Sequence, residues 1–133
     1  MSAMAMARGP FDVKLNPLPL HDAGQHPTLA RMSVDKTYHG DLEATGSGEM
    51  LTAGTDVKGS AVYVAIERVS GTLHGRRGTF ALHHTGVMTR GVLSLTVTVV
   101  PDSGTDELTG LGGRLNIIIE GRAHSYEFDY TLP

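Results

Sequence analysis

Apolar and polar side chains alternate along most of this 133-residue chain, and this pattern constrains the fold more than any other feature. Residues 124–132, with the sequence HSYEFDYTL, carry ring-bearing or aliphatic side chains at every second position and polar ones between them. Successive side chains of a β-strand point to opposite faces, so this period predicts half-buried strands. No window of useful length has the three- and four-residue spacing of an amphipathic helix. We therefore expect an all-β protein.

About eight such runs are separated by segments rich in glycine, proline and polar residues. They cover residues 10–15, 29–38, 42–53, 60–73, 79–88, 92–100, 115–119 and 124–132. Long strands joined mostly by short turns predict an antiparallel closed barrel of about eight strands with an up-and-down, lipocalin-like order. A barrel of this size can enclose one small ligand. We expect a single barrel domain over residues 10–133, preceded by a disordered tail over residues 1–9.

Charge and composition exclude several classes of partner. The chain has 11 basic and 14 acidic residues and a net charge of −3, which argues against nucleic acid or an anionic membrane surface as a partner. It has no cysteine, so disulfides and thiolate chemistry are excluded. No segment approaches the roughly 20 apolar residues of a membrane span. The opening residues lack the basic start and apolar length of a signal peptide, so we expect no membrane partner and a cytoplasmic location.

The run over residues 60–73 is apolar on both faces. Val62, Val64 and Ile66 alternate with Tyr63 and Ala65. A strand with two apolar faces needs cover on both. One face can point into the barrel, and the simplest cover for the other is a second subunit. We therefore expect a homo-oligomer.

Ionisable side chains interrupt several of the apolar strand faces, and aromatic side chains share those faces. The candidate catalytic residues are Glu67, His84 and His124, and the candidate ligand-binding residues are Tyr38, Tyr63, Phe80, Tyr126 and Phe128. If these faces point inward, a carboxylate, two imidazoles and several phenols meet in one cavity. Such a cavity is typical of sites for a mostly apolar ligand with a few polar anchors.

Two functions follow from this set. The first is a carrier or sensor that binds a small hydrophobic molecule without chemistry. The second is acid–base catalysis, with the pKa of Glu67 raised by burial, Glu67 acting as base, and His84, His124 or Tyr126 as proton donor. A purely structural reading stays open beside both, in which each polar group is satisfied by the protein and the tyrosines fill the barrel.

We expect no metal and no cofactor. His83 and His84 are adjacent in a strand and point to opposite faces, so they do not share an ion. The histidines show neither HxxxH nor EF-hand spacing. The glycines around Gly46 and Gly110 do not complete a phosphate-binding motif, and they indicate turns, bulges or close backbone approach instead.

Four stretches together resemble a known family. They are residues 58–73 (KGSAVYVAIERVSGTL), 78–86 (GTFALHHTG), 99–111 (VVPDSGTDELTGL) and 124–130 (HSYEFDY). In combination they are similar to the bacterial family known as domain of unknown function 3224, over roughly residues 9–132.

The resemblance implies an allene oxide cyclase-like β-barrel. Related barrels include cyclases that mostly hold a reactive substrate in a shaped cavity, so the catalytic alternative becomes an isomerase or cyclase acting by acid–base chemistry or by templating its substrate. No catalytic residue is defined for the closer family, and the resemblance therefore assigns no role to any residue here.

Overall fold

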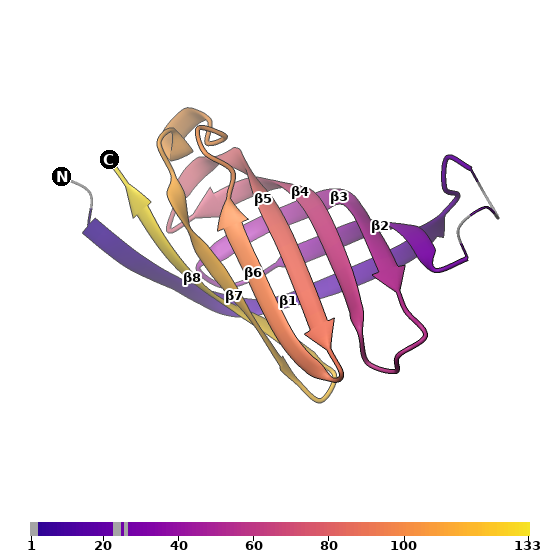
Figure 1. Cartoon of the computed structure of the whole chain (residues 1–133). Coiled ribbons are helices and arrows are strands. Elements are labelled where there is room, and N and C mark those ends of the chain that lie inside the picture. The colour runs from indigo at the N-terminus through magenta and orange to yellow at the C-terminus, as the bar shows by residue number, and fades with distance from the viewer. Residues whose placement is uncertain (1–2, 23–24, 26) are drawn as a thin grey trace.

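The chain forms one closed barrel of eight antiparallel strands over the residues that the computed structural model describes, 3–22, 25 and 27–133 (Figure 1). Each strand pairs with the next, and β8 pairs with β1. The strands are β1 (Ala3–Leu18), β2 (Leu29–Tyr38), β3 (Leu42–Gly54), β4 (Ala61–Leu73), β5 (Arg76–Thr89), β6 (Val92–Val99), β7 (Gly112–Glu120) and β8 (Ala123–Leu132). A short 3₁₀ helix, η1 (Asp106–Leu108), lies between β6 and β7. Within the described ranges no helix is long and apolar enough to cross a membrane. The expected all-β class and eight-stranded closed barrel are confirmed.

Two-residue turns set the register of the long central strands. His74 and Gly75 connect β4 to β5 and have φ angles of 47° and 80°. Arg90 and Gly91 connect β5 to β6 and have φ angles of 47° and 91°. Positive φ at both central residues is the geometry of a type I′ turn, whose twist matches that of the strands it joins. The connection between the expected runs over residues 60–73 and 79–88 is therefore shorter than expected, because β5 already begins at Arg76.

The N-terminal segment corrects one expectation. Residues 3–9 are the first half of β1 and pair with β8 from Ala3↔Leu132 to Phe11↔His124, so a disordered tail over residues 1–9 is wrong for residues 3–9. Residues 1 and 2 lie outside the described range. Ala7 is fully buried. Methionine and alanine are both apolar, so their alternation carries no contrast from which a strand is predicted.

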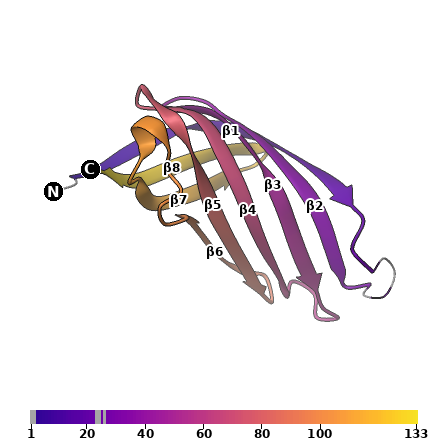
Figure 2. The ribbon, with the colours of Figure 1, turned by 90° about the horizontal axis from the view of Figure 1, so that it is seen from above.

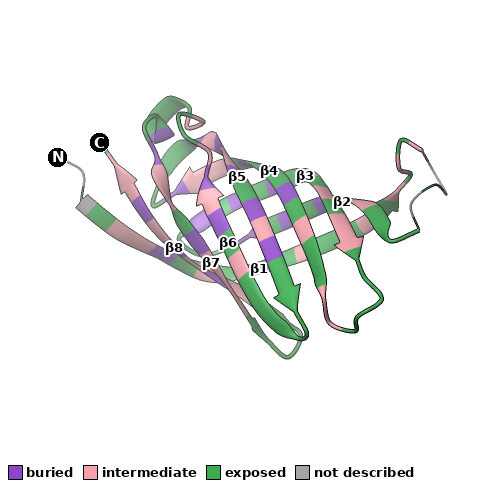
Figure 3. Ribbon diagram, in the orientation of Figure 1, coloured by how far each residue is buried: buried purple, intermediate pink, exposed green. Residues whose placement is uncertain are grey.

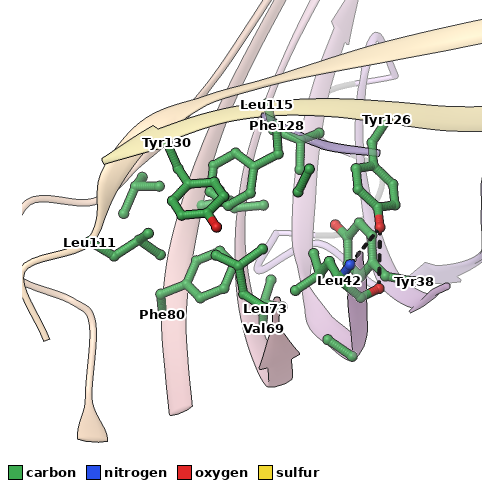
Figure 4. Close-up of a cluster of buried hydrophobic side chains, with 14 of the residues drawn as sticks. Tyr38, Leu42, Val69, Leu73, Phe80, Leu111, Leu115, Tyr126, Phe128 and Tyr130 are labelled. Carbon is green, nitrogen blue, oxygen red and sulfur yellow. Dashed lines mark hydrogen bonds between the residues drawn. The ribbon is translucent and has the colours of Figure 1, made fainter. Parts of the chain in front are cut away.

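Aromatic and aliphatic side chains fill one half of the barrel, here called the closed half (Figure 4). Its members come from the strand ends near the β2–β3 and β4–β5 turns and from the β6–β7 connection: Tyr38, Leu42, Val69, Leu73, Phe80, Leu108, Leu111, Leu115, Tyr126, Phe128 and Tyr130. The Phe80 and Phe128 rings stack with centroids 5.8 Å apart. The η1 segment covers this end, since its Leu108 is 1% exposed. Burial falls toward the opposite end of the strands, as Figure 3 shows for β5 and β6.

Candidate functional site

A cavity of about 420 Å³ occupies the other half of the barrel, here called the open half. All eight strands contribute to its wall, which is mainly aliphatic: Val13, Leu15, Val34, Met50, Ala65, Leu93, Leu95, Ile117 and Ile119 are among its members. Its polar lining residues are Lys36, Thr52, Tyr63, Glu67, His84 and His124. This volume lies in the range of about 300–1,000 Å³ typical of small-molecule sites.

Four polar side chains meet where the cavity borders the closed half, and we call Lys36, Tyr38, Glu67 and His84 the polar cluster. Glu67 of β4 is 1% exposed and lies at its centre. Its Oε1 accepts hydrogen bonds from Lys36 Nζ at 3.2 Å and from His84 Nε2 at 2.9 Å. Its Oε2 accepts one from the Tyr38 hydroxyl at 2.5 Å. The cluster therefore joins β2, β4 and β5 through one buried carboxylate.

Two glycines of β3 make room for this cluster. Gly46 and Gly48 occupy inward positions of β3, between Lys36 on β2 and Glu67 on β4. A Cβ atom on Gly46 would lie 2.0 Å from Glu67 Oε2, and one on Gly48 would lie 1.9 Å from the Ile66 carbonyl oxygen. The β3–β4 register continues without an extra residue past both glycines. Of the alternatives that the sequence left open here, close approach is therefore the one observed.

The environment of Glu67 favours its ionised form. Burial by itself raises the pKa of Glu67, but the His84 hydrogen bond, the Lys36 charge and the Tyr38 hydrogen bond together outweigh it and hold the pKa below its ordinary value. Burial and the nearby Glu67 carboxylate raise the pKa of Tyr38 well above its usual value, so this phenol stays protonated. The expectation of a raised Glu67 pKa is wrong, because three hydrogen-bond donors contact the buried carboxylate and stabilise its ionised form.

His84 connects the cluster to the cavity. Nε2 of His84 is bonded to Glu67, whereas Nδ1 has no hydrogen-bond partner among the described residues. No fully buried side-chain nitrogen or oxygen in the described structure lacks a partner, so Nδ1 is in contact with free space. Because His84 lines the cavity and is only 4% exposed, that space is the cavity.

The remaining candidate residues divide between the two halves of the barrel. Tyr63 and His124 line the cavity, with His124 packed on the Phe11 ring at a centroid distance of 5.4 Å. No hydrogen bond or ion pair joins His124 to the polar cluster in the described structure. The three candidate catalytic residues thus do not form one constellation.

Four of the five expected ligand-binding residues lie away from the cavity. Tyr38, Phe80, Tyr126 and Phe128 point inward but pack in the closed half, and none of them lines the cavity. The Tyr126 hydroxyl is engaged by backbone groups: it accepts a bond from Leu42 N and donates to the His39 carbonyl. The direction of a side chain depends on its place in its own strand. Its position along the barrel axis depends on the stagger of all eight strands.

Lys36 is the member of the cluster that sequence reasoning missed. It is 7% exposed, and its Nζ lies 5.2 Å from the centre of the Phe11 ring. The available signal was its place between Val34 and Tyr38 on an otherwise apolar face. A lysine is rarely buried unless it is paired, so a lysine at that position predicts a buried carboxylate as its partner.

The wall of the barrel is incomplete between β6 and β7. Thr98↔Arg114 is the one residue pair matched between these strands in the described structure, whereas the other neighbouring strands pair over eight residues or more. The β5–β6 hairpin and the β7–β8 hairpin diverge from that point, as seen from above in Figure 2. Leu93 and Leu95 on one side and Ile117 and Ile119 on the other line the cavity, so the cavity borders this gap.

No group of three or more histidine, aspartate or glutamate side chains in the described part of the chain is arranged to hold a metal ion. The site is an apolar cavity with a hydrogen-bonded carboxylate, an amine and an imidazole at its inner end, and Thr52, Tyr63 and His124 add polar groups to its wall.

The fold and this site define an eight-stranded barrel with one filled half and one hollow half. The family of proteins of unknown function DUF3224 matches residues 7–130, and the chain belongs to that family. The family resemblance read from the sequence is thereby confirmed. The chain is similar to a protein of unknown function from the DUF3224 family of Shewanella oneidensis MR-1, whose crystal structure was determined at 1.84 Å. The two share 52% identity over 96% of each chain, with a TM-score of 0.90. No curated protein matches the chain.

Proposed function

We propose that this barrel binds a small, mostly apolar molecule in the cavity of its open half. The observation that carries the proposal is the cavity itself: about 420 Å³ of space surrounded by aliphatic side chains, in a barrel whose other half is tightly filled. An apolar molecule placed there gains the free energy of leaving water. The polar cluster supports the proposal as well. A buried ion pair adds little stability over apolar residues of the same size, so the stability of the barrel does not explain why charged groups lie at the inner end of the cavity, whereas contact with a ligand does.

The test uses the neutral fluorescent probe N-phenyl-1-naphthylamine, which brightens in apolar surroundings. Ala65 lines the cavity, and Ile66 beside it points outward and is 56% exposed. We expect saturable binding by the wild-type protein, loss of binding with Ala65→Phe, and normal binding with Ile66→Phe. Met88→Trp, at the exposed edge of the cavity, is the second blocking variant if Ala65→Phe does not fold. An absence of saturable binding to the wild type would refute the proposal.

An isomerase or cyclase is the second candidate, and one observation favours it. The hydrogen bond between Glu67 and His84 Nε2 leaves the other imidazole nitrogen facing the cavity, which is the arrangement of a histidine base held in place by a carboxylate. Glu67 then positions His84 and does not itself take the proton. An acid–base isomerisation of this kind begins with removal of a carbon-bound proton by the base. In D₂O the wild type should therefore accelerate deuterium uptake next to the carbonyl of 2-decanone, and His84→Asn should abolish the acceleration.

The gap between β6 and β7 is the passage that we propose for the ligand. The gap predicts different behaviour for two engineered cysteine pairs in this cysteine-free chain. Thr98→Cys with Arg114→Cys should oxidise readily to a disulfide, since adjacent strand partners have Cα atoms about 4.5–5.5 Å apart. Ser94→Cys with Ile118→Cys should stay reduced, because these positions have no matched partner across the gap. Equal oxidation of both pairs would show that the gap is closed in solution.

The outer face of β3, β4 and β5 is where we propose that a second copy of the chain packs. Leu51, Val62, Val64, Ile66 and Val87 are neighbours on this face, and each is at least 38% exposed. A contiguous apolar patch of this kind is typical of an interaction surface. Light scattering should report an oligomer for the wild type and a smaller species for Ile66→Glu. Ser70→Glu, farther along the same outward face, should leave the mass unchanged. A monomeric wild type would exclude the second copy.

A further inference from the structure

We propose that the ligand of this cavity carries one neutral hydroxyl group and that this hydroxyl binds His84 at the polar cluster. The inference rests on the proposed function and narrows it from an apolar molecule to an apolar alcohol or phenol. It is carried by the direction of the hydrogen bonds in the cluster.

The direction of those bonds fixes which nitrogen of His84 carries the proton. An ionised carboxylate has no proton to donate, so Glu67 Oε1 accepts from both Lys36 Nζ and His84 Nε2. In the neutral form of an imidazole one ring nitrogen carries the proton, and in His84 the bond to the Glu67 carboxylate places that proton on Nε2. Its Nδ1 then presents a lone pair to the cavity, and it can only accept a hydrogen bond.

Lys36 supplies the opposite capacity in the same part of the cavity. Its ammonium group has three donors, and Glu67 Oε1 is its one hydrogen-bond acceptor in the described structure. Lys36 lines the cavity and bonds the same carboxylate oxygen as His84. A ligand group that donates to His84 Nδ1 and offers lone pairs to Lys36 satisfies both residues. A hydroxyl group does this with a single oxygen atom.

Other head groups fit the cluster less well. A carboxylate has no proton for Nδ1 and would face the Glu67 carboxylate, while the positive charge of Lys36 is already balanced by Glu67. An ammonium group would lose its water in an apolar cavity and lie near Lys36. A plain hydrocarbon would displace water from Nδ1 and leave that acceptor unpaired, which costs free energy.

The test compares three ligands of nearly equal size at pH 8: 2-naphthol, naphthalene and 2-naphthoate. Each competes with N-phenyl-1-naphthylamine for the wild-type protein. A buried hydrogen bond is worth about tenfold in affinity, so we expect 2-naphthol to bind about tenfold more tightly than naphthalene. We expect 2-naphthoate to bind at least as weakly as naphthalene. Equal affinities for the three, or tightest binding by 2-naphthoate, would overturn the inference.

Two adjacent histidines provide the matched variants. His84→Leu should reduce the affinity for 2-naphthol to that for naphthalene and leave naphthalene unchanged. His83→Leu, on the outward face of the same strand, should keep the tenfold preference. In the wild type, the ¹⁵N resonance of His84 Nδ1 should move with 2-naphthol and stay in place with naphthalene, which tests the contact even if His84→Leu does not fold. A preference that survives in folded His84→Leu, or an Nδ1 resonance that both ligands move alike, would overturn the inference.

The two proposals fail in different ways. If the wild-type protein does not bind the probe, the proposed function itself is wrong. If it binds the probe in the cavity but does not prefer 2-naphthol, the cavity is a binding site and only the hydroxyl inference is wrong.

Discussion

The change Glu67→Gln removes the charge at the centre of the polar cluster and keeps the size of the side chain. Lys36 and Glu67 have side chains 5% and 1% exposed, and Lys36 Nζ lies 3.2 Å from Glu67 Oε1. Removing one member of a buried ion pair costs about 3–5 kcal/mol, because the other charge stays buried without a partner. The ammonium of Lys36 borders the cavity, so we expect the lower end, about 3 kcal/mol, for the loss in the free energy of unfolding.

The second arm of the experiment removes both charges. In Lys36→Met combined with Glu67→Gln no buried charge lacks its partner, and the glutamine oxygen still accepts from His84 or Tyr38. We expect this double variant to lose about 1 kcal/mol, so that the two changes are strongly non-additive. Urea unfolding followed by circular dichroism measures the single variants Glu67→Gln and Lys36→Met and the double variant.

The control is an ion pair of the same chemistry on the surface. Glu49 Oε1 and Arg31 Nε lie 2.7 Å apart, but the side chains of Glu49 and Arg31 are 55% and 35% exposed. Water and salt screen such a pair, and Glu49→Gln should leave the stability close to that of the wild type. A loss below about 1 kcal/mol for Glu67→Gln, or additive losses in the double variant, would refute the view of the cluster as a tightly coupled buried pair.

Three further changes test the same cluster by urea unfolding. The pKa of Glu67 is lower in the folded protein than its ordinary value of 4.5, so the unfolded chain takes up this proton first as the pH falls. The free energy of unfolding should therefore decrease below about pH 4.5, and the decrease should be smaller in Glu67→Gln. Gly46→Ala places a Cβ 2.0 Å from Glu67 Oε2 and should cost about 2 kcal/mol, whereas Gly54→Ala on the same strand, with its nearest atom at 3.8 Å, should cost less than about 0.5 kcal/mol. Tyr38→Phe removes a hydrogen bond to a buried carboxylate and should cost about 1.5–3 kcal/mol; no loss would mean that water replaces the hydroxyl.

The grouping of residues on one face of each central strand could be predicted from local pattern, but which face points inward could not, because the run over residues 60–73 is apolar on both faces. Side-chain direction alternates strictly along a strand, so grouping Glu67 with Ala65 and Val69 required only the spacing of the sequence, and all three are buried. The same rule separated His84 from His83. A turn at Gly75 was likewise expected, because glycine readily adopts the positive φ that such a turn requires, although its two-residue length was not predicted.

The position of a residue along the barrel axis could not be predicted in this way. Phe128 and His124 share one face of β8, yet one packs in the closed half and the other lines the cavity. Which of them borders empty space depends on the stagger between strands and on the size of side chains from the opposite wall. No local pattern in a single strand contains that information.

Alternation and turn residues were enough for the strand class and for which residues share a face, because both depend on neighbours within a few residues. The absence of cysteine excluded thiolate chemistry by composition alone. The filled and hollow halves, the gap between β6 and β7, and the meeting of Lys36, Glu67 and His84 arose only when eight strands were brought into register. Interactions between residues about 17 and 31 positions apart depend on three-dimensional distance, and the tertiary structure alone sets that distance.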